Sequence, residues 1–262
     1  MEANNNNLSM DKKIESGNSD SVPQNDPDKN RLESFDQPRL HVAVMQNSIE
    51  DIELIIKGED INCLNSEGDT VLHIGVISNS NISTIKYLLD LGAEINAKAA
   101  NGITALHLAA DLCRIDFIEL LLRYGANVKN TDDFACSALH YASEPEAIQA
   151  LIKAGGEVNA KSKMGFTPMH CLLLNDGSVE SIESFLKAGA DPNIKDNEGL
   201  TSLHYVAKFN FTQSNKDIFW MLLDFGADLN ALTDGNKSVL ELAIISKNSR
   251  IVEMIKGLLS NK

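Results

Sequence analysis

The sequence predicts an all-α solenoid, in which short units of two helices stack in a row behind a polar N-terminal tail. The six histidines His41, His73, His107, His140, His170 and His204 recur at intervals of 30 to 34 residues. A glycine-containing signature follows each of them after 15 to 22 residues, with apolar residues at helical spacing in between. Such a period indicates a stack, because each helix pair must bury its apolar face against neighbouring units.

Residues 1–36 are expected to form a disordered tail. They are rich in Asn, Ser, Asp and Lys, and they carry four basic against eight acidic residues. So few apolar side chains cannot offset the entropy lost when the chain becomes ordered. A short binding motif or address within the tail is the alternative. The remaining residues, 37–262, form the predicted repeat domain.

The third unit shows the expected course of each repeat. Thr104 is expected to cap the first helix, because its hydroxyl can accept from an early backbone N–H. The pattern breaks near Cys113, and Gly125 then ends the second helix by adopting left-handed geometry. The apolar positions at a period of about 3.6 residues are Leu106, Ala109, Ala110, Ile115, Ile118, Leu121 and Leu122.

Seven units follow one another from the first histidine onward. They begin RLHVAV, TVLHIGV, TALHLAA, SALHYAS, TPMHCLL, TSLHYVA and SVLELAI, where Glu241 takes the histidine position. In the fourth unit Ala135 replaces a turn glycine, and the turn between the helices is shortened around Pro145. In the sixth, about four residues are inserted within positions 208–217. We expect irregular geometry at both places.

The composition argues against several classes of function. The chain has 37 acidic and 23 basic residues and a net charge of −14, so we expect no binding to nucleic acid or membranes, which requires clustered cations. No apolar run approaches the roughly 20 residues of a membrane span. Four widely spaced cysteines and the lack of a signal peptide favour free thiols in the cytoplasm. Secretion into a host cell by another route stays open.

These motifs resemble the ankyrin repeat, a unit of about 33 residues with a turn and two helices that opens T-P-L-H-x-A. The segments TPMHCL (167–172) and TALHLA (104–109) carry the resemblance, together with GADPN (189–193) and GADLN (226–230). The resemblance covers residues 37–262 and implies an ankyrin solenoid. Its first and last units are atypical, as expected of units that cap a stack.

Three interpretations of the histidines can be compared. Catalytic bases would need a nucleophile or a carboxylate partner, and none recurs beside them. Zinc needs about four converging donors, whereas equivalent positions in a stack lie about 10 Å apart. The resemblance implies a structural role, in which each histidine hydrogen-bonds near the Thr or Ser three residues before it. We therefore expect no metal, no cofactor and no catalytic residue.

A partner-binding surface is expected on the turns. The residues between the turn glycine and the motif threonine include Ile103, Phe166 and Leu200, with Phe134 and Met164 nearby. Exposed, these apolar side chains would mark an interaction surface. The alternative is that they fold down against the next turn. Trp220 is a second candidate, because tryptophan is enriched at binding hot spots, although it could instead pack against the insertion.

The predicted function is therefore a non-catalytic scaffold that binds another protein through its concave surface, acting as a monomer. The alternative is a regulatory subunit or inhibitor of a partner enzyme, possibly one directed at a host. An enzyme is the third class, and no P-loop, HExxH or GxSxG motif supports it. Asn96, Asn159 and Asn230 are expected to stabilise turns, and their hydroxylation is a minor possibility.

Overall fold

The computed structural model describes residues 38–209 and 215–260, which form seven consecutive helix pairs. The first helices of the pairs are α2 Arg39–Met45, α4 Val71–Ile77, α6 Ala105–Asp111, α8 Ala138–Tyr141, α10 Pro168–Leu174, α12 Ser202–Lys208 and α14 Val239–Ile245. The second helices are α3 Ile49–Ile55, α5 Ile82–Asp90, α7 Ile115–Arg123, α9 Pro145–Lys153, α11 Val179–Lys187, α13 Asn215–Asp224 and α15 Ser249–Ser260. The predicted all-α solenoid is confirmed.

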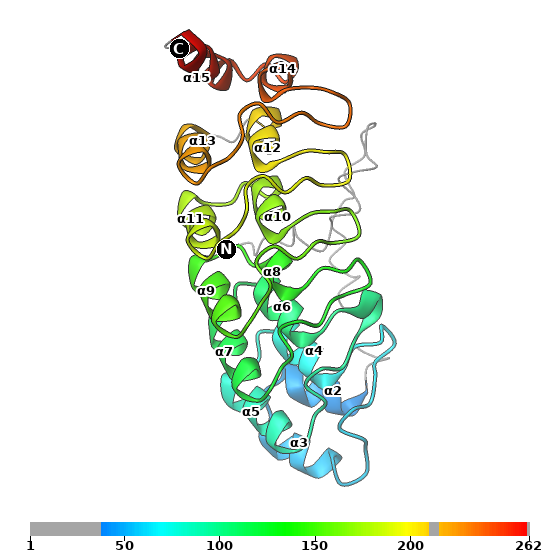
Figure 1. Cartoon of the computed structure of the whole chain (residues 1–262). Helices are drawn as coiled ribbons and strands as arrows, with labels where there is room; N and C mark the ends of the chain where they lie inside the picture. Colours follow the sequence, from blue (N-terminus) through cyan, green and yellow to red (C-terminus); the bar gives the residue numbers. More distant parts are fainter. Residues whose placement is uncertain (1–37, 210–214, 261–262) are drawn as a thin grey trace, which may run out of the picture.

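The helices form two layers, with the turns projecting from one side (Figure 1). The first helices lie next to the turns and the second helices form the outer layer. Each first helix packs on its own second helix and on the first helix of the next unit. A single turn of 3-10 helix, Ala100–Gly102, lies in the turn of the third unit. None of the helices described combines the length and apolar character required to cross a membrane.

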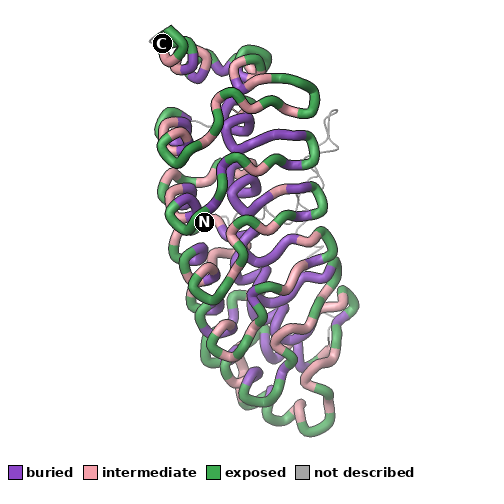
Figure 2. Tube along the Cα trace, viewed as in Figure 1, coloured by how far each residue is buried: buried purple, intermediate pink, exposed green. Residues whose placement is uncertain are grey.

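The core is continuous and runs along the first helices (Figure 2). Leu106 of α6 and Ile118 of α7 are both buried, as the helical spacing predicts. Small residues let the two helices of a unit approach each other. At Gly75 of α4, an added Cβ would lie only 2.3 Å from Cδ1 of Ile85 on α5. Stability therefore depends on contacts between neighbours in the stack.

The expected helix ends are confirmed in the third unit. Thr104 caps α6, where its side chain accepts from the backbone N–H of His107. Gly125 follows the end of α7 with a φ of +91°, the left-handed conformation in which glycine carries no steric cost. The same conformation recurs after α5, α9, α11 and α13, at Gly92, Gly155, Gly189 and Gly226.

The fourth unit departs from the others, as its sequence predicts. Helix α8 has only four residues, and Pro145 occupies the first turn of α9. Ala135 stands where a turn glycine is found elsewhere and has a φ of +61°, which is strained for alanine. The expected tail, residues 1–36, and most of the expected insertion, residues 210–214, lie outside the described residues.

Candidate functional site

Four of the six motif histidines, His41, His73, His107 and His140, reach the turn of the next unit through Nε2, whereas Nε2 of His170 and His204 is buried without a hydrogen-bond partner among the described residues. In His107, Nδ1 accepts from the backbone N–H and from the hydroxyl of Thr104, at 3.1 and 2.8 Å. Because Nδ1 accepts from a backbone N–H, the ring proton lies on Nε2, which donates to the Cys136 carbonyl at 3.1 Å. One imidazole therefore connects two units.

This contact recurs along the stack. Nε2 of His41, His73 and His140 lies 2.9, 3.0 and 3.2 Å from the carbonyls of Asp69, Ile103 and Phe166, respectively. Burial lowers the pKa of all six histidines, and those of His140 and His170 fall to about 4. The rings are therefore neutral at pH 7. Within residues 38–209 and 215–260, no three His, Cys, Asp or Glu side chains gather as metal ligands.

Two tyrosine–aspartate pairs hold the turns and were not anticipated from the sequence. Oδ1 of Asp132 accepts from the backbone N–H groups of Phe134 and Cys136, at 2.9 and 2.8 Å. Its Oδ2 accepts from the buried Tyr141 hydroxyl at 2.5 Å. Burial and this carboxylate raise the pKa of Tyr141. The signal was an Asp nine residues before a Tyr, which recurs as Asp196 and Tyr205 at the same distance.

The expected exposure of Ile103 and Leu200 is wrong. Their exposed fractions are 7% and 5%, so both belong to the core. Ile103 and Leu200 each follow a turn glycine with positive φ. The carbonyl of Ile103 accepts from His73 of the preceding unit, and the side chain of Ile103 packs into the core. Phe166, at the same position, is half-buried and meets the ring of Tyr205 edge-on at 6.3 Å. At Ile103, Phe166 and Leu200 the alternative therefore applies, in which the side chain folds down into the structure.

Phe134 and Met164 are exposed at the tips of two successive turns. Their exposed fractions are 39% and 46%. A backbone hydrogen bond of 2.8 Å from Lys163 N–H to the Phe134 carbonyl joins the two tips. The Met164 carbonyl accepts from Asn197 of the following turn at 3.1 Å. The two apolar side chains therefore sit on a rigid, hydrogen-bonded edge.

Trp220 is half-buried in α13 and packs against the core with its ring edge-on to Phe219, 5.6 Å between centroids. In the same unit Phe209 stacks on Tyr205, with centroids 5.9 Å apart. Phe211, also part of the insertion, lies outside the described residues. The structure therefore places Trp220 away from the turn tips, in the outer layer.

Asparagines after the outer helices join consecutive units. Oδ1 of Asn96 accepts from the Asn127 N–H at 2.8 Å, and Oδ1 of Asn159 accepts from the Asp191 N–H at 2.9 Å. Asn62 and Asn193 make the equivalent contacts in their units, to Glu94 and Asp228. Asn230, in the sixth unit, is exposed.

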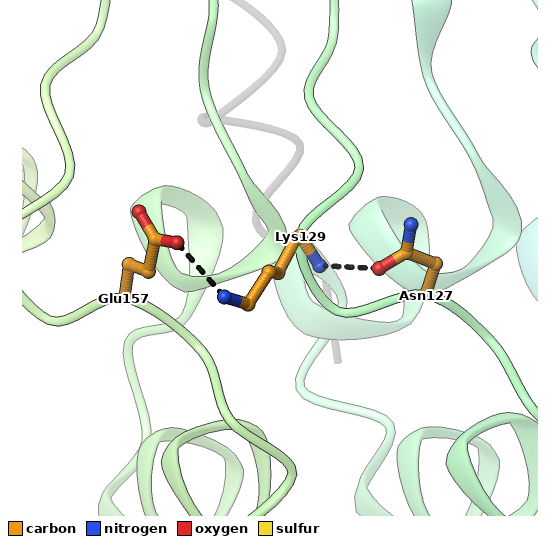
Figure 3. Close-up of polar contacts among 3 residues, drawn as sticks. All are labelled: Asn127, Lys129 and Glu157. Carbon is orange, nitrogen blue, oxygen red and sulfur yellow. Dashed lines mark hydrogen bonds and ion pairs between the residues drawn. The ribbon is translucent and has the colours of Figure 1, made fainter.

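Lys129 replaces the asparagine in the third unit (Figure 3). Its Nζ lies 3.1 Å from Oε1 of Glu157 in the next unit, and its backbone N–H donates to Oδ1 of Asn127 at 3.0 Å. An exposed ion pair thus stands where four other units have a hydrogen bond from a backbone N–H to an asparagine side chain. Such pairs contribute about 0–1 kcal/mol.

Comparisons with known proteins agree with this architecture. A family model of ankyrin repeats in three copies matches residues 40–132, 127–196 and 172–262. A probable serine/threonine-protein kinase of Dictyostelium discoideum is 34% identical over 172 residues, which are 63% of this chain and 20% of the kinase. The chain spans between 13% and 24% of the length of the curated relatives compared.

Two solved structures share the fold. The ankyrin repeat domain of Bcl-3, a member of the IkappaB protein family, matches with a TM-score of 0.70 and 24% identity, covering 84% of this chain and 98% of that one. The human ASB11 ankyrin repeat domain matches with a TM-score of 0.68 and 24% identity, covering 79% and 92%. At this identity the likeness concerns the fold alone.

Proposed function

The chain belongs to the ankyrin repeat family, and on that premise we propose that it binds another protein through its turn tips and first helices. Ankyrin repeats are generally protein–protein interaction modules, and their fold is typically non-catalytic. We further propose that this chain acts without a cofactor, in the cytoplasm, and that nucleic acid is not its partner, as the charge of −14 favours.

The exposed pair Phe134 and Met164 is the observation that carries this proposal. Aromatic residues and methionine are enriched at the centres of protein interfaces, and charged residues at their rims. Asp133 and Lys163 are exposed directly beside the pair and can form such a rim. The backbone that carries the pair is held by turn-to-turn hydrogen bonds, so little backbone entropy would be lost on binding.

A second exposed apolar patch lies on the first helices of the first two units. Met45 of α2 and Ile77 of α4 each stand four residues after the motif histidine and are exposed. Helices α2 and α4 pack side by side, so these two side chains belong to one surface. We propose that a partner covers the turn tips first and extends toward this patch along the inner layer.

The test is affinity capture with matched variants. The wild-type chain and a Phe225→Glu variant should recover the same partner, since Phe225 is similarly exposed, 43%, but follows an outer helix. Phe134→Glu and Met164→Glu should lose it, with unchanged thermal unfolding. A partner that still binds both variants would refute the proposed surface. If the partner is an enzyme, assaying it with and without the chain distinguishes a regulator from a scaffold.

A further inference from the structure

We propose that the last unit of one chain stacks on the first unit of a second copy, so that the solenoid continues from molecule to molecule. This self-association would use the two ends of the stack and leave the turn tips free. It replaces the monomer expected from the sequence. The argument rests on the residues that stand at the ends, compared with their equivalents at internal unit boundaries.

The C-terminal end keeps the apolar residues of an internal boundary. Ile244 stands three residues after the motif position, and 54% of it is exposed. Among the described residues nothing packs over it in the way that the next unit covers its equivalents. Five of the six equivalents are fully or almost fully buried, and Ser143 of the irregular fourth unit is half-buried. The five are Val44, Val76, Ala110, Leu173 and Ala207. The end is therefore shaped to receive another unit.

Glu241 changes the chemistry of this end. At His73, His107 and His140, Nδ1 accepts at the helix start and Nε2 donates to the next unit. In Glu241, Oε2 takes the first role by accepting from the N–H and hydroxyl of Ser238, at 2.8 and 2.9 Å. The other carboxylate oxygen can only accept. The next layer must therefore offer a donor, not a carbonyl.

The first unit supplies charged groups at positions that later units bury. Arg39 begins α2 and Asp51 lies in the first turn of α3, and both are exposed. Leu54, on the same face of α3, is 66% exposed. The equivalent residues of the third unit, which has a unit on either side, are buried: Ala105, Phe117 and Leu120.

Internal boundaries show which residues would meet. Oγ1 of Thr84 donates to Oδ1 of Asn47 in the preceding unit, at 3.1 Å. Thr84 is equivalent to Asp51, and Asn47, six residues after its histidine, is equivalent to Lys247. In the same register, Asp51 of one copy meets Lys247 of the other. Both side chains are exposed in the single chain, and the pair is opposite in charge.

A second internal contact has a ready equivalent. Oγ of Ser80 donates to the Val44 carbonyl of the preceding unit, at 2.9 Å. The equivalent residues at the ends are Ser48 and Ile244. The Ser48 hydroxyl accepts from a backbone N–H within its own unit, so its proton is available to donate to the Ile244 carbonyl of the other copy.

The donor that Glu241 requires is Arg39. Nε2 of His73 reaches the carbonyl of Ile103, two residues before the first residue of α6. The carboxylate of Glu241 would thus face the start of α2 in the second copy, where Arg39 is the first helical residue. A guanidinium donates to a carboxylate oxygen in place of the missing histidine contact.

A second copy stacked head to tail is the occupant that these groups favour. It pairs Glu241 with Arg39 and Lys247 with Asp51, and it covers Ile244. If two C-terminal ends met instead, Glu241 and Lys247 of one copy would face the same residues of the other, and Arg39 and Asp51 would take no part. A head-to-tail contact joins different surfaces and does not close on itself, so longer chains of molecules form at high concentration.

The test is sedimentation of the full chain from about 1 µM to about 500 µM, a range that covers weak interfaces. The weight-average mass should rise with concentration. Asp51→Lys and Lys247→Glu should each weaken association at least about tenfold, because like charges then meet, and the double variant should restore it. Ile244→Glu should abolish association, whereas Phe225→Glu, an exposed residue that follows the outer helix α13, should leave it unchanged. Circular dichroism confirms that each variant is folded.

Several results would overturn this inference. One is a wild-type chain that stays monomeric at every concentration. A second is association that Ile244→Glu leaves intact. A third is Lys247→Glu acting while Asp51→Lys is silent, which indicates contact between two C-terminal ends. A double charge reversal that fails to restore association excludes this register. None of these results bears on Phe134 and Met164, so the proposed partner surface is tested separately.

Discussion

Acidification is expected to destabilise the stack well before most carboxylates are protonated. His140 and His170 have a folded pKa of about 4 against an ordinary value of 6.5, because burial disfavours the charged ring. In the unfolded chain both bind protons as the pH falls below 6.5, while the folded chain resists protonation until about pH 4. Their contribution to stability is therefore present at pH 7 and is lost between these values.

The magnitude follows from the size of the shift. At pH 5, which is about 1.5 units below the ordinary pKa of 6.5, proton binding stabilises the unfolded chain. At about 1.4 kcal/mol for each unit, this lowers the free energy of unfolding by about 2 kcal/mol for each histidine. For His140 and His170 together the loss is about 4 kcal/mol, a large fraction of the stability of an ordinary domain. The remaining four motif histidines, whose pKa values are also lowered, act in the same direction.

Urea unfolding followed by circular dichroism at pH 7, 6 and 5 measures this effect. The free energy of unfolding of the wild-type chain should fall at each step. His140→Gln should be less stable at pH 7, since it loses the contact to the Phe166 carbonyl, but its stability should fall by about 2 kcal/mol less by pH 5. A wild-type stability that stays level, or a variant that keeps the full slope, would refute the assignment to buried neutral histidines.

Two further predictions concern the turns. Gly165→Ala should lower the free energy of unfolding by about 2–3 kcal/mol, against about 1 kcal/mol for Gly92→Ala. Both glycines have positive φ, but only at Gly165 does the new Cβ approach a backbone atom, Asn197 N at 2.7 Å. Thermal unfolding compares the two variants. Equal losses of stability would contradict the clash. Lys129→Asn should leave stability within about 1 kcal/mol of wild type at low salt and remove its salt dependence, as the Glu157 ion pair is exposed. A larger loss in chemical denaturation would show that the pair matters more than its exposure suggests.

The helices and their limits could be predicted because local chemistry determines them. The Thr104 cap, the Gly125 terminus and the irregular geometry around Pro145 all depend on residues within one or two turns of the chain. The turn residues Phe134 and Met164 were predicted to be available for a partner, and they are exposed. Their neighbours on the turns, however, required the packed structure.

The direction of the Ile103 and Leu200 side chains is the clearest case of what was not predictable. The sequence shows an apolar residue after a glycine, which suits either a binding surface or a core. The packed structure decides which of the two applies: the histidine of the preceding unit binds the backbone of Ile103, and the side chain of Ile103 lies in the core. The pairing of Asp132 with Tyr141 is hidden for the same reason, because nine residues separate groups that only the fold brings to 2.5 Å.

The sequence by itself therefore determined the class of fold, the number of units, their order and, in the third unit, the residues Thr104 and Gly125 that begin the first helix and end the second. The repeat period, the helix caps and the turn glycines depend on residues close together in the sequence, so the local sequence of each unit determines its own helices. The tertiary structure alone decided which face of each unit meets its neighbour, which apolar residues stay exposed, and that Arg39, Asp51, Glu241 and Lys247 stand at the two ends of the stack. Those properties belong to the boundaries between units, and a boundary exists only once two units are packed together.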